Sequence, residues 1–300
     1  YNKLWEPLLK IAEFFKLKSP QLRQNWLSKN DLINLLKLCD YELIKHYNKI
    51  ILPIKIPFLN FFFNNVIANL PLFRNFSLIS FAHLKKIDFK KKDDLSVSIV
   101  IPARNEKGNI ENVVKRIPKF TKNIEIIFSE GHSKDNTFEE IKKVKNKYAN
   151  SNIKYFKQSG EGKGNAVREA FKLASGDILI ILDADLTVQP EELPKFYRAL
   201  IENKADFING SRFVYPLEKD SMRFLNMLGN KFFSGLLSFA IDQKLTDTLC
   251  GTKAMFKEDY LKLEHNRIFF GNFDPFGDFD LIFGAAKLGI KIMDIPIRYQ

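Results

Sequence analysis

The sequence predicts an α/β protein with a mainly parallel sheet and helices on both of its faces, preceded by a smaller, mostly helical N-terminal segment. From Ser96 onward, short apolar runs alternate with segments that carry apolar residues at helical spacing, which is typical of a parallel sheet with crossover helices. The run Ile178–Leu182 contains no polar residue, as expected for a strand that is buried on both faces. It ends in Asp183 and Asp185, so the same strand delivers two carboxylates to its carboxyl end.

The N-terminal segment, residues 1–87, begins with predicted helix and ends in an aromatic stretch. Ser28–Asp31 precedes an apolar helical pattern and is a suitable N-cap. Tyr41–Ile44 and Lys49–Leu52 are predicted as the two short strands of a hairpin. Pro57–Leu84 is rich in phenylalanine, and it either lies in a membrane interface or packs against its neighbours.

Charged residues 88–95 predict a solvated linker, and we expect a domain of residues 96–300 after it. This domain contains alternating strands and helices. Strands are predicted at Val97–Ile101, Ile124–Phe128, Ile153–Phe156, Ile178–Leu182, Asp206–Asn209 and Ile292–Pro296. Helices are predicted at Ile110–Ile117, Phe138–Val144, Ala166–Ala174 and Pro190–Asn203, and an apolar helix within Phe213–Leu245 either belongs to the core or faces a membrane.

The composition narrows the classes of partner. The net charge is +12, and residues 1–94 carry 16 Lys and Arg against 8 Asp and Glu. No groove-reading motif accompanies this charge, so we expect no nucleic acid and favour an anionic membrane surface.

Two cysteines, Cys39 and Cys250, form neither a disulfide framework nor a metal-ligand pattern, which fits a reducing compartment. No apolar run is long enough to span a bilayer, so we expect a peripheral protein at the cytoplasmic face of a membrane. The first residue is not Met, and we expect a piece of a longer polypeptide that continues beyond residue 300.

The Asp183-Ala184-Asp185 motif is the strongest local signal for a metal. Side chains alternate in an extended segment, so the two carboxylates point to the same side. Ligands of open α/β sheets bind at the carboxyl ends of strands. Two Asp there suit Mg²⁺ or Mn²⁺, which also takes water and substrate phosphates as ligands. The alternative is a solvated, Asp-rich loop.

Three turns follow the strands before this one: Pro102–Glu106, Glu130–Thr137 and Gly160–Asn165. In the second turn, Asp135 or Asn136 can cap the following helix. The third turn is rich in glycine but matches neither a P-loop nor the dinucleotide fingerprint.

Four motifs in this order resemble glycosyltransferase family 2, in particular its polyprenyl-phosphate, dolichyl-phosphate-mannose-synthase-like branch. They are Ile99–Glu106, Gly162–Ala166, Leu182–Leu186 and Gly210–Arg212, and the resemblance covers about residues 96–299. It implies a Rossmann-like GT-A fold. It also implies that the donor is bound by Pro102, Ala103, Arg104, Asn105, Glu106, Glu130, Lys163, Asp183 and Ala184. By the same resemblance, Asp183 and Asp185 hold the metal, and Arg212 and Arg223 hold an acceptor phosphate.

The sequence departs from the family pattern at several positions. Arg104 stands where the family often has Tyr, and Glu130-Gly131 stands where it usually has two Asp. Thr187 replaces a frequent Gln, and the basic residues expected after Tyr299 lie beyond the chain. These departures affect above all the contacts to the donor base.

Residues 1–87 resemble the C-terminal end of a class I S-adenosylmethionine-dependent methyltransferase through Asn25–Ser28, Asp31-Leu32, Leu35-Leu36 and Tyr41–Ile44. The glycine-rich cofactor loop of that family is absent. We therefore expect no methyl transfer by this chain, although a methyltransferase is a possible partner.

The predicted function is inverting transfer of a sugar from a nucleotide-diphospho-sugar to a polyprenyl phosphate. A lipid phosphate is ionised near neutral pH and needs no strong base. A hydroxyl acceptor would need one, and Asp278 or Asp280, which otherwise cap the last helix, is then the candidate. A different class of function is a non-catalytic, membrane-docked scaffold for a methyltransferase.

Overall fold

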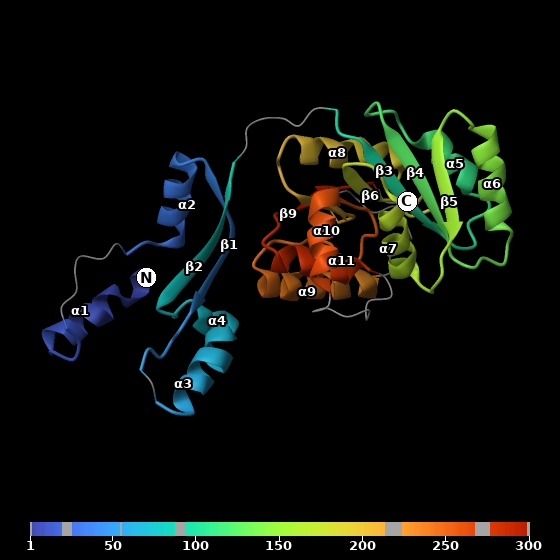
Figure 1. The fold of residues 1–300 in the computed structure, drawn as a ribbon. Coiled ribbons are helices and arrows are strands. Elements are labelled where there is room, and N and C mark those ends of the chain that lie inside the picture. The colour runs from blue at the N-terminus through green and yellow to red at the C-terminus, as the bar shows by residue number, and fades with distance from the viewer. Residues whose placement is uncertain are drawn as a thin grey trace. The chain divides into compact units, whose positions relative to one another are not determined.

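The computed structural model describes residues 2–19, 26–54, 56–87, 94–213, 224–267 and 277–298. The chain divides into two compact units, Tyr1–Ile87 and Asp88–Gln300 (Figure 1), and each is described by itself.

The second unit is built on a seven-stranded sheet in the order β5-β4-β3-β6-β8-β7-β9. The strands are β3 (Val97–Ala103), β4 (Ile124–Glu130), β5 (Asn152–Lys157), β6 (Ile178–Ile181), β7 (Phe207–Ser211), β8 (Lys253–Phe256) and β9 (Ile292–Pro296). β3 pairs parallel with β4 and β6, β4 pairs parallel with β5, and β7 pairs parallel with β9. β8 runs antiparallel to both of its neighbours. The predicted α/β fold with a mainly parallel sheet is confirmed.

Helices cover both faces of this sheet (Figure 1). They are α5 (Ile110–Arg116), α6 (Thr137–Lys147), α7 (Lys163–Leu173), α8 (Leu193–Ile201), α9 (Phe224–Ile241), α10 (Lys257–His265) and α11 (Asp278–Lys287). The buried side chains of α5, α6 and α8 pack with Ile99 and Ile101 of β3, whereas those of α7, α10 and α11 pack with Val100. This division follows from the alternation of side chains along a strand.

Strand β8 was not predicted from the sequence. It has only four residues and begins with Lys253, so its apolar run is too short to be distinctive. The order of strands depends on long-range pairing, which a pattern along the chain does not contain.

The chain passes to opposite sides of β3, toward β4 and β5 first and toward β6 later. Such a reversal creates a crevice outside the carboxyl ends of the central strands, where ligands of open α/β sheets bind. Turn 102–106 and Asp183 emerge there.

The first unit contains an antiparallel pair, β1 (Tyr41–Lys49) and β2 (Ile79–Lys86). Its helices are α1 (Glu6–Phe14), α2 (Lys29–Leu38), α3 (Leu59–Phe61) and α4 (Pro71–Arg74). A 3-10 turn, Lys3–Trp5, precedes α1. A π-helical turn, Phe62–Val66, and a 3-10 turn, Ile67–Asn69, follow α3. Ser28 caps α2 through a capping box with Asp31, as the sequence indicated.

The predicted hairpin of Tyr41–Ile44 and Lys49–Leu52 is wrong. Residues 41–49 form one continuous strand, and its partner is β2, with Lys49 opposite Ile79. Both faces of this two-stranded sheet are partly exposed, so the strand accepts the polar side chains of Lys45 and Asn48.

Candidate active site

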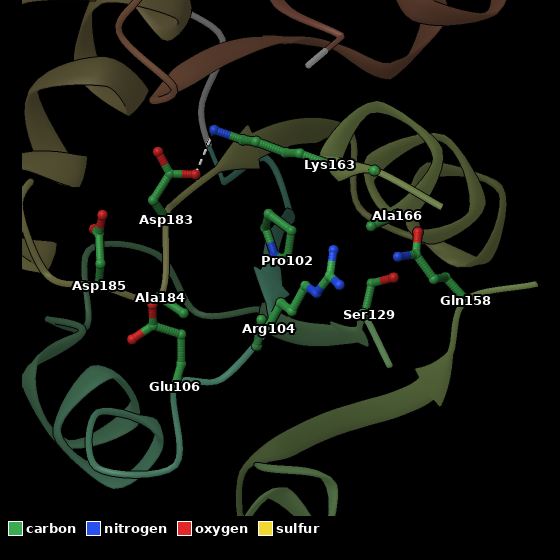
Figure 2. Close-up of a pocket in the computed structure, with 13 residues that line it drawn as sticks. Pro102, Arg104, Glu106, Ser129, Gln158, Lys163, Ala166, Asp183, Ala184 and Asp185 are labelled. Atoms are coloured by element: carbon green, nitrogen blue, oxygen red, sulfur yellow. Dashed lines mark ion pairs between the residues drawn. The ribbon is translucent and has the colours of Figure 1, made fainter. Parts of the chain in front are cut away.

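A pocket of about 320 Å³ lies at the carboxyl ends of β3 and β6 (Figure 2). This volume falls within the range of small-molecule sites. The pocket is lined by Pro102, Ala103, Arg104, Glu106, Ser129, Gly131, Gln158, Gly162, Lys163, Ala166, Asp183, Ala184 and Asp185. The structure therefore brings together the predicted donor and metal residues, with the exception of Asn105 and Glu130.

Lys163 and Asp183 form an ion pair inside the pocket. Lys163 is the first residue of α7, and its Nζ lies 2.5 Å from Oδ1 of Asp183 (Figure 2). Burial of the ammonium group lowers its pKa, but the carboxylates of Asp183 and Asp278 outweigh this effect, so the pKa of Lys163 is raised. The lysine is therefore a fixed positive charge at the N-terminus of α7, where the helix dipole also favours anions.

Asp185 is the better candidate for a metal ligand. Its Oδ1 accepts hydrogen bonds from the backbone N–H and the hydroxyl of Thr187, at 3.0 and 2.8 Å. Its Oδ2 accepts no hydrogen bond within the described part of the chain. Asp183, in contrast, is already neutralised by Lys163.

Within the described residues, no cluster of three His, Cys, Asp or Glu could enclose a metal ion. A site of one or two carboxylates suits a hard cation that takes its remaining ligands from phosphates and water. The residues present therefore fit Mg²⁺ or Mn²⁺ bound together with a diphosphate.

Asn105 and Glu130 stabilise the first two turns and do not line the pocket. Asn105 accepts a hydrogen bond from the N–H of Lys134 at 2.8 Å and donates its own N–H to Ser133 at 2.9 Å. The buried carboxylate of Glu130 accepts the N–H of Ser133 at 2.5 Å. In this structure Glu130 contacts its own turn, and its contact with the donor stays a prediction.

Sequence reasoning missed the polar groups at the opposite end of the pocket. Figure 2 shows Ser129 and Gln158 near Arg104, away from Asp183 and Asp185. Ser129 is buried, and its hydroxyl has no hydrogen-bond partner among the described residues. Gln158 accepts a hydrogen bond from Asn165 through Oε1, and its Nε2 faces Gly131. A side chain at Gly131 would crowd Arg104 and Gln158. The sequence did offer one signal that this end of the pocket differs from the family pattern, because Gly131 stands where the family usually has its second Asp.

The loop Asp247–Lys253 joins the pocket to α9. Gly251 packs so closely against Asp183 and Lys163 that a Cβ at this position would overlap both side chains. Four residues earlier, Asp247 accepts two hydrogen bonds from the Arg212 guanidinium, at 2.7 and 2.9 Å. It also accepts one from Asn230 of α9 at 2.8 Å. Burial raises the pKa of Asp247, but the bonds from Arg212 outweigh this and hold it below its usual value.

The two Asp at the start of α11 are paired with cations. Asp278 is buried and lies 2.8 Å from the ammonium of Lys253, while Asp280 pairs with Arg267. Lys253 had not been singled out as a site residue. The predicted role of either Asp as a base therefore requires that an ion pair be broken. Arg223, the second predicted phosphate ligand, lies outside the described residues.

Together, the mainly parallel sheet, the switch-point pocket and the carboxylates after β6 define an α/β protein with a GT-A fold. The chain belongs to glycosyl transferase family 2: the sequence profile of this family matches residues 98–263, more than half of the chain.

The chain is similar to a dolichol-phosphate mannosyltransferase of Pyrococcus furiosus, with 33% identity over 180 residues, which are 59% of this chain and 50% of that protein. It is also similar to a dolichyl-phosphate hexose transferase of Haloferax volcanii, with 30% identity over 209 residues, 69% of this chain and 83% of that protein. The chain thus spans only half the length of the Pyrococcus relative.

Among solved structures, the fold matches glucosyl-3-phosphoglycerate synthase of Mycobacterium tuberculosis in complex with Mn²⁺, UDP and glucosyl-3-phosphoglycerate. The TM-score is 0.51 and the identity is 18%, and the match covers 69% of this chain and 72% of that one. This likeness supports the fold.

Proposed function

We propose that this chain transfers a sugar from a nucleotide-diphospho-sugar to a polyprenyl phosphate at a membrane surface, with inversion at the anomeric carbon. The observation that carries the proposal is the loop Asp247–Lys253. At one end of this loop, Gly251 packs against Asp183, which lines the pocket proposed for the donor. At the other end, Asp247 bonds both Arg212 and Asn230 of α9.

The donor half of the proposal rests on complementary charge. Lys163 and the N-terminus of α7 face the pocket and stabilise the negative charge of a diphosphate. Arg104, Ser129 and Gln158 supply polar groups for the base and ribose at the other end. Asp185, with Asp183 nearby, would hold Mg²⁺ or Mn²⁺, which supplies Lewis-acid stabilisation of the leaving diphosphate when bound.

The acceptor half rests on the inverted polarity of α9. Its polar residues Asn230 and Ser234 are buried, whereas the apolar side chains of Leu228, Phe232, Phe233 and Leu236 are exposed. A helix of a soluble domain normally shows the opposite arrangement. An outward apolar face beside the largely covered side chain of Arg212 suits an acceptor with a phosphate head and an apolar chain. In the described part of the chain, no helix is both long and apolar enough to cross a bilayer.

In the proposed reaction, an oxygen of the acceptor phosphate attacks the anomeric carbon from the face opposite the diphosphate. A new C–O bond forms, and the C–O bond to the diphosphate breaks with its electron pair on the departing nucleoside diphosphate. Lys163 stabilises the charge that grows on this leaving group. The acceptor phosphate is a dianion above a pKa of about 6, so no protein base is required.

The test is sugar transfer to a short-chain polyprenyl phosphate in detergent, with the corresponding polyprenol as the matched acceptor without phosphate. We expect transfer to the phosphate alone. Asp185→Asn should abolish it in Mn²⁺, whereas Glu139→Gln on the exposed face of α6 should not change it.

The alternative hypothesis, transfer to a hydroxyl acceptor, predicts the opposite result. If polyprenol or a saccharide is the better acceptor and Asp278→Asn abolishes transfer, the lipid phosphate is the wrong substrate. Arg212→Lys keeps the charge but loses the two-pronged contact with Asp247, and it should raise the KM for the acceptor more than the KM for the donor. If no sugar is transferred and no nucleotide-sugar binds, a non-catalytic scaffold is the correct function.

A further inference from the structure

The first unit carries a segment whose charge is entirely of one sign. Residues 43–87 contain six Lys and Arg and no Asp or Glu. The same residues contain seven Phe. Most of these Phe lie in residues 56–76, here called the aromatic segment, in which Arg74 is the only charged residue. The aromatic segment connects the end of β1 to the start of β2 and includes α3 and α4 (Figure 1).

Two polar side chains of the aromatic segment, Asn60 and Asn64, are used internally. Asn64 accepts hydrogen bonds from the backbone N–H groups of Ile51 and Leu52 and donates one to the carbonyl of Leu52, each at 2.9 Å. Asn60 donates to the carbonyls of Leu52 and Ile54, at 3.2 and 3.1 Å. These contacts fix the segment on the backbone that leads out of β1.

The aromatic side chains, in contrast, face outward. Phe58 is 90% exposed, Phe61 is 67% exposed and Leu72 is 78% exposed. Phe62, Phe73 and Phe76 are exposed as well. Within the described part of the aromatic segment, Ala68 is the only residue in the buried hydrophobic core. Folding of the first unit therefore leaves a large part of these side chains exposed, and an exposed apolar surface of this kind marks an interaction site.

We propose that the aromatic segment inserts into the interface of an anionic membrane, with the surrounding Lys and Arg of residues 43–87 contacting lipid phosphates. Apolar side chains that enter the acyl boundary and cations that remain at the headgroups are the two components of interfacial binding. Lys45 and Lys49 of β1 both lie against the ring of Tyr47, with each Nζ within 5.7 Å of its centroid, so the positive charge continues onto the sheet.

The charge favours a membrane over a protein partner. A stretch of 45 residues without one carboxylate is complementary to a uniformly negative surface. Protein interfaces are fixed by a mixture of donors, acceptors and charges of both signs. In the aromatic segment, however, the side chains of Asn60 and Asn64 are already bonded to the protein's own backbone. The inference rests on the proposed function in one respect: the proposed acceptor, a polyprenyl phosphate, places the protein at a membrane.

The experiment is flotation of the whole chain with vesicles of phosphatidylcholine containing about 30% phosphatidylglycerol, with no donor or acceptor present. We expect binding that weakens in pure phosphatidylcholine and at high salt. The double variant Phe58→Ser/Phe61→Ser should lower the partition coefficient at least about tenfold. Its folding is preserved because both side chains are exposed, and circular dichroism checks this.

Phe14→Ser in α1 is the matched control, since Phe14 is 82% exposed in the same unit but lies outside the aromatic segment. It should bind vesicles like the parent. A positive readout comes from Phe58→Trp, whose emission should shift to the blue when anionic vesicles are added, whereas that of Phe14→Trp should not.

Failure of this inference is distinguishable from failure of the proposed function, because sugar transfer is measured separately in detergent. Equal binding of the parent and the double variant would overturn the inference, as would the absence of binding. Self-association of the parent that disappears in the double variant, without vesicle binding, would assign the aromatic segment to a protein partner instead.

Discussion

Lys163 occupies the position where three negative charges are expected to meet. It pairs with Asp183 and faces the site of the proposed diphosphate, and the charge of Asp278 helps to raise its pKa. Its pairing with Asp183 balances the pocket before the donor arrives. When a diphosphate binds, the same ammonium can contact phosphate oxygens, so one side chain serves both states.

Lys163→Met should therefore weaken binding of nucleoside diphosphate by about 10- to 100-fold, the equivalent of one charge-assisted hydrogen bond of roughly 1.5–3 kcal/mol. Calorimetric titration with UDP and GDP measures the change. Lys172→Met on the exposed part of α7 is the matched control and should bind like the parent. Unchanged affinity in Lys163→Met would show that the lysine serves only the fold.

The two cysteines differ in reactivity for a physical reason. Cys250 is buried, and burial raises the pKa of its thiol from 9.0 to about 12. At pH 8, very little of the Cys250 thiol is then in the reactive thiolate form. Cys39 is exposed.

A thiol reagent at pH 8 should consequently modify one cysteine in the native protein and two after denaturation. Mass spectrometry of the labelled peptides identifies which one reacts. Rapid modification of Cys250 in the native state would mean that the loop around it opens.

At the scale of elements, the loop Asp247–Lys253 is the best place for a test, because no space is left around Gly251 for a side chain. Gly251→Ala places a methyl group against Asp183 and Lys163, so either the loop or the ion pair must move. We expect turnover to fall at least about tenfold, since a small misplacement of reacting groups is costly. The melting temperature should change little, because the altered contact is in the pocket rather than in the core.

Gly229→Ala, at a position in α9 where an added Cβ meets no atom, is the control for the same chemical change. It should keep parental turnover. If both variants transfer sugar at the parental rate, the tight packing of Gly251 has no role in the reaction.

Considered as a whole, the chain shows which features local pattern can predict. The Ile178 strand and its Asp pair were identified because burial on both faces leaves an uninterrupted apolar run, and because ligands gather at strand ends. The hairpin prediction was wrong for a long-range reason: 29 residues separate β1 from its partner β2, and the pattern along the chain does not reveal pairing over such an interval.

The pairing of charges could not be predicted in the same way. Lys163 with Asp183, Lys253 with Asp278 and Arg212 with Asp247 each join residues at least 20 positions apart. Such partners are set by the tertiary fold, whereas sequence motifs reveal only that charged residues are present. Ser129 and Gln158 were missed because a single polar residue at or just after the end of a strand carries no distinguishing signal.

The first unit also permits a test of the methyltransferase resemblance. No glycine-rich loop follows a strand in residues 1–87, so calorimetric titration with S-adenosylmethionine should show no binding heat. The same titration with a nucleotide-sugar and Mn²⁺ serves as the positive control for the protein preparation. Saturable heat with S-adenosylmethionine would mean that the cofactor binds without the expected loop.

The short path from Asp183 through Gly251 to Asp247 and Arg212 has a thermodynamic consequence. In the proposed function, donor and acceptor would contact opposite ends of one stretch of backbone, so we expect the affinity for one to depend on the occupancy of the other. Linkage requires this dependence to be equal in both directions. If the proposed nucleotide-sugar raises the affinity for the proposed lipid phosphate by some factor, the lipid phosphate must raise the affinity for the nucleotide-sugar by the same factor.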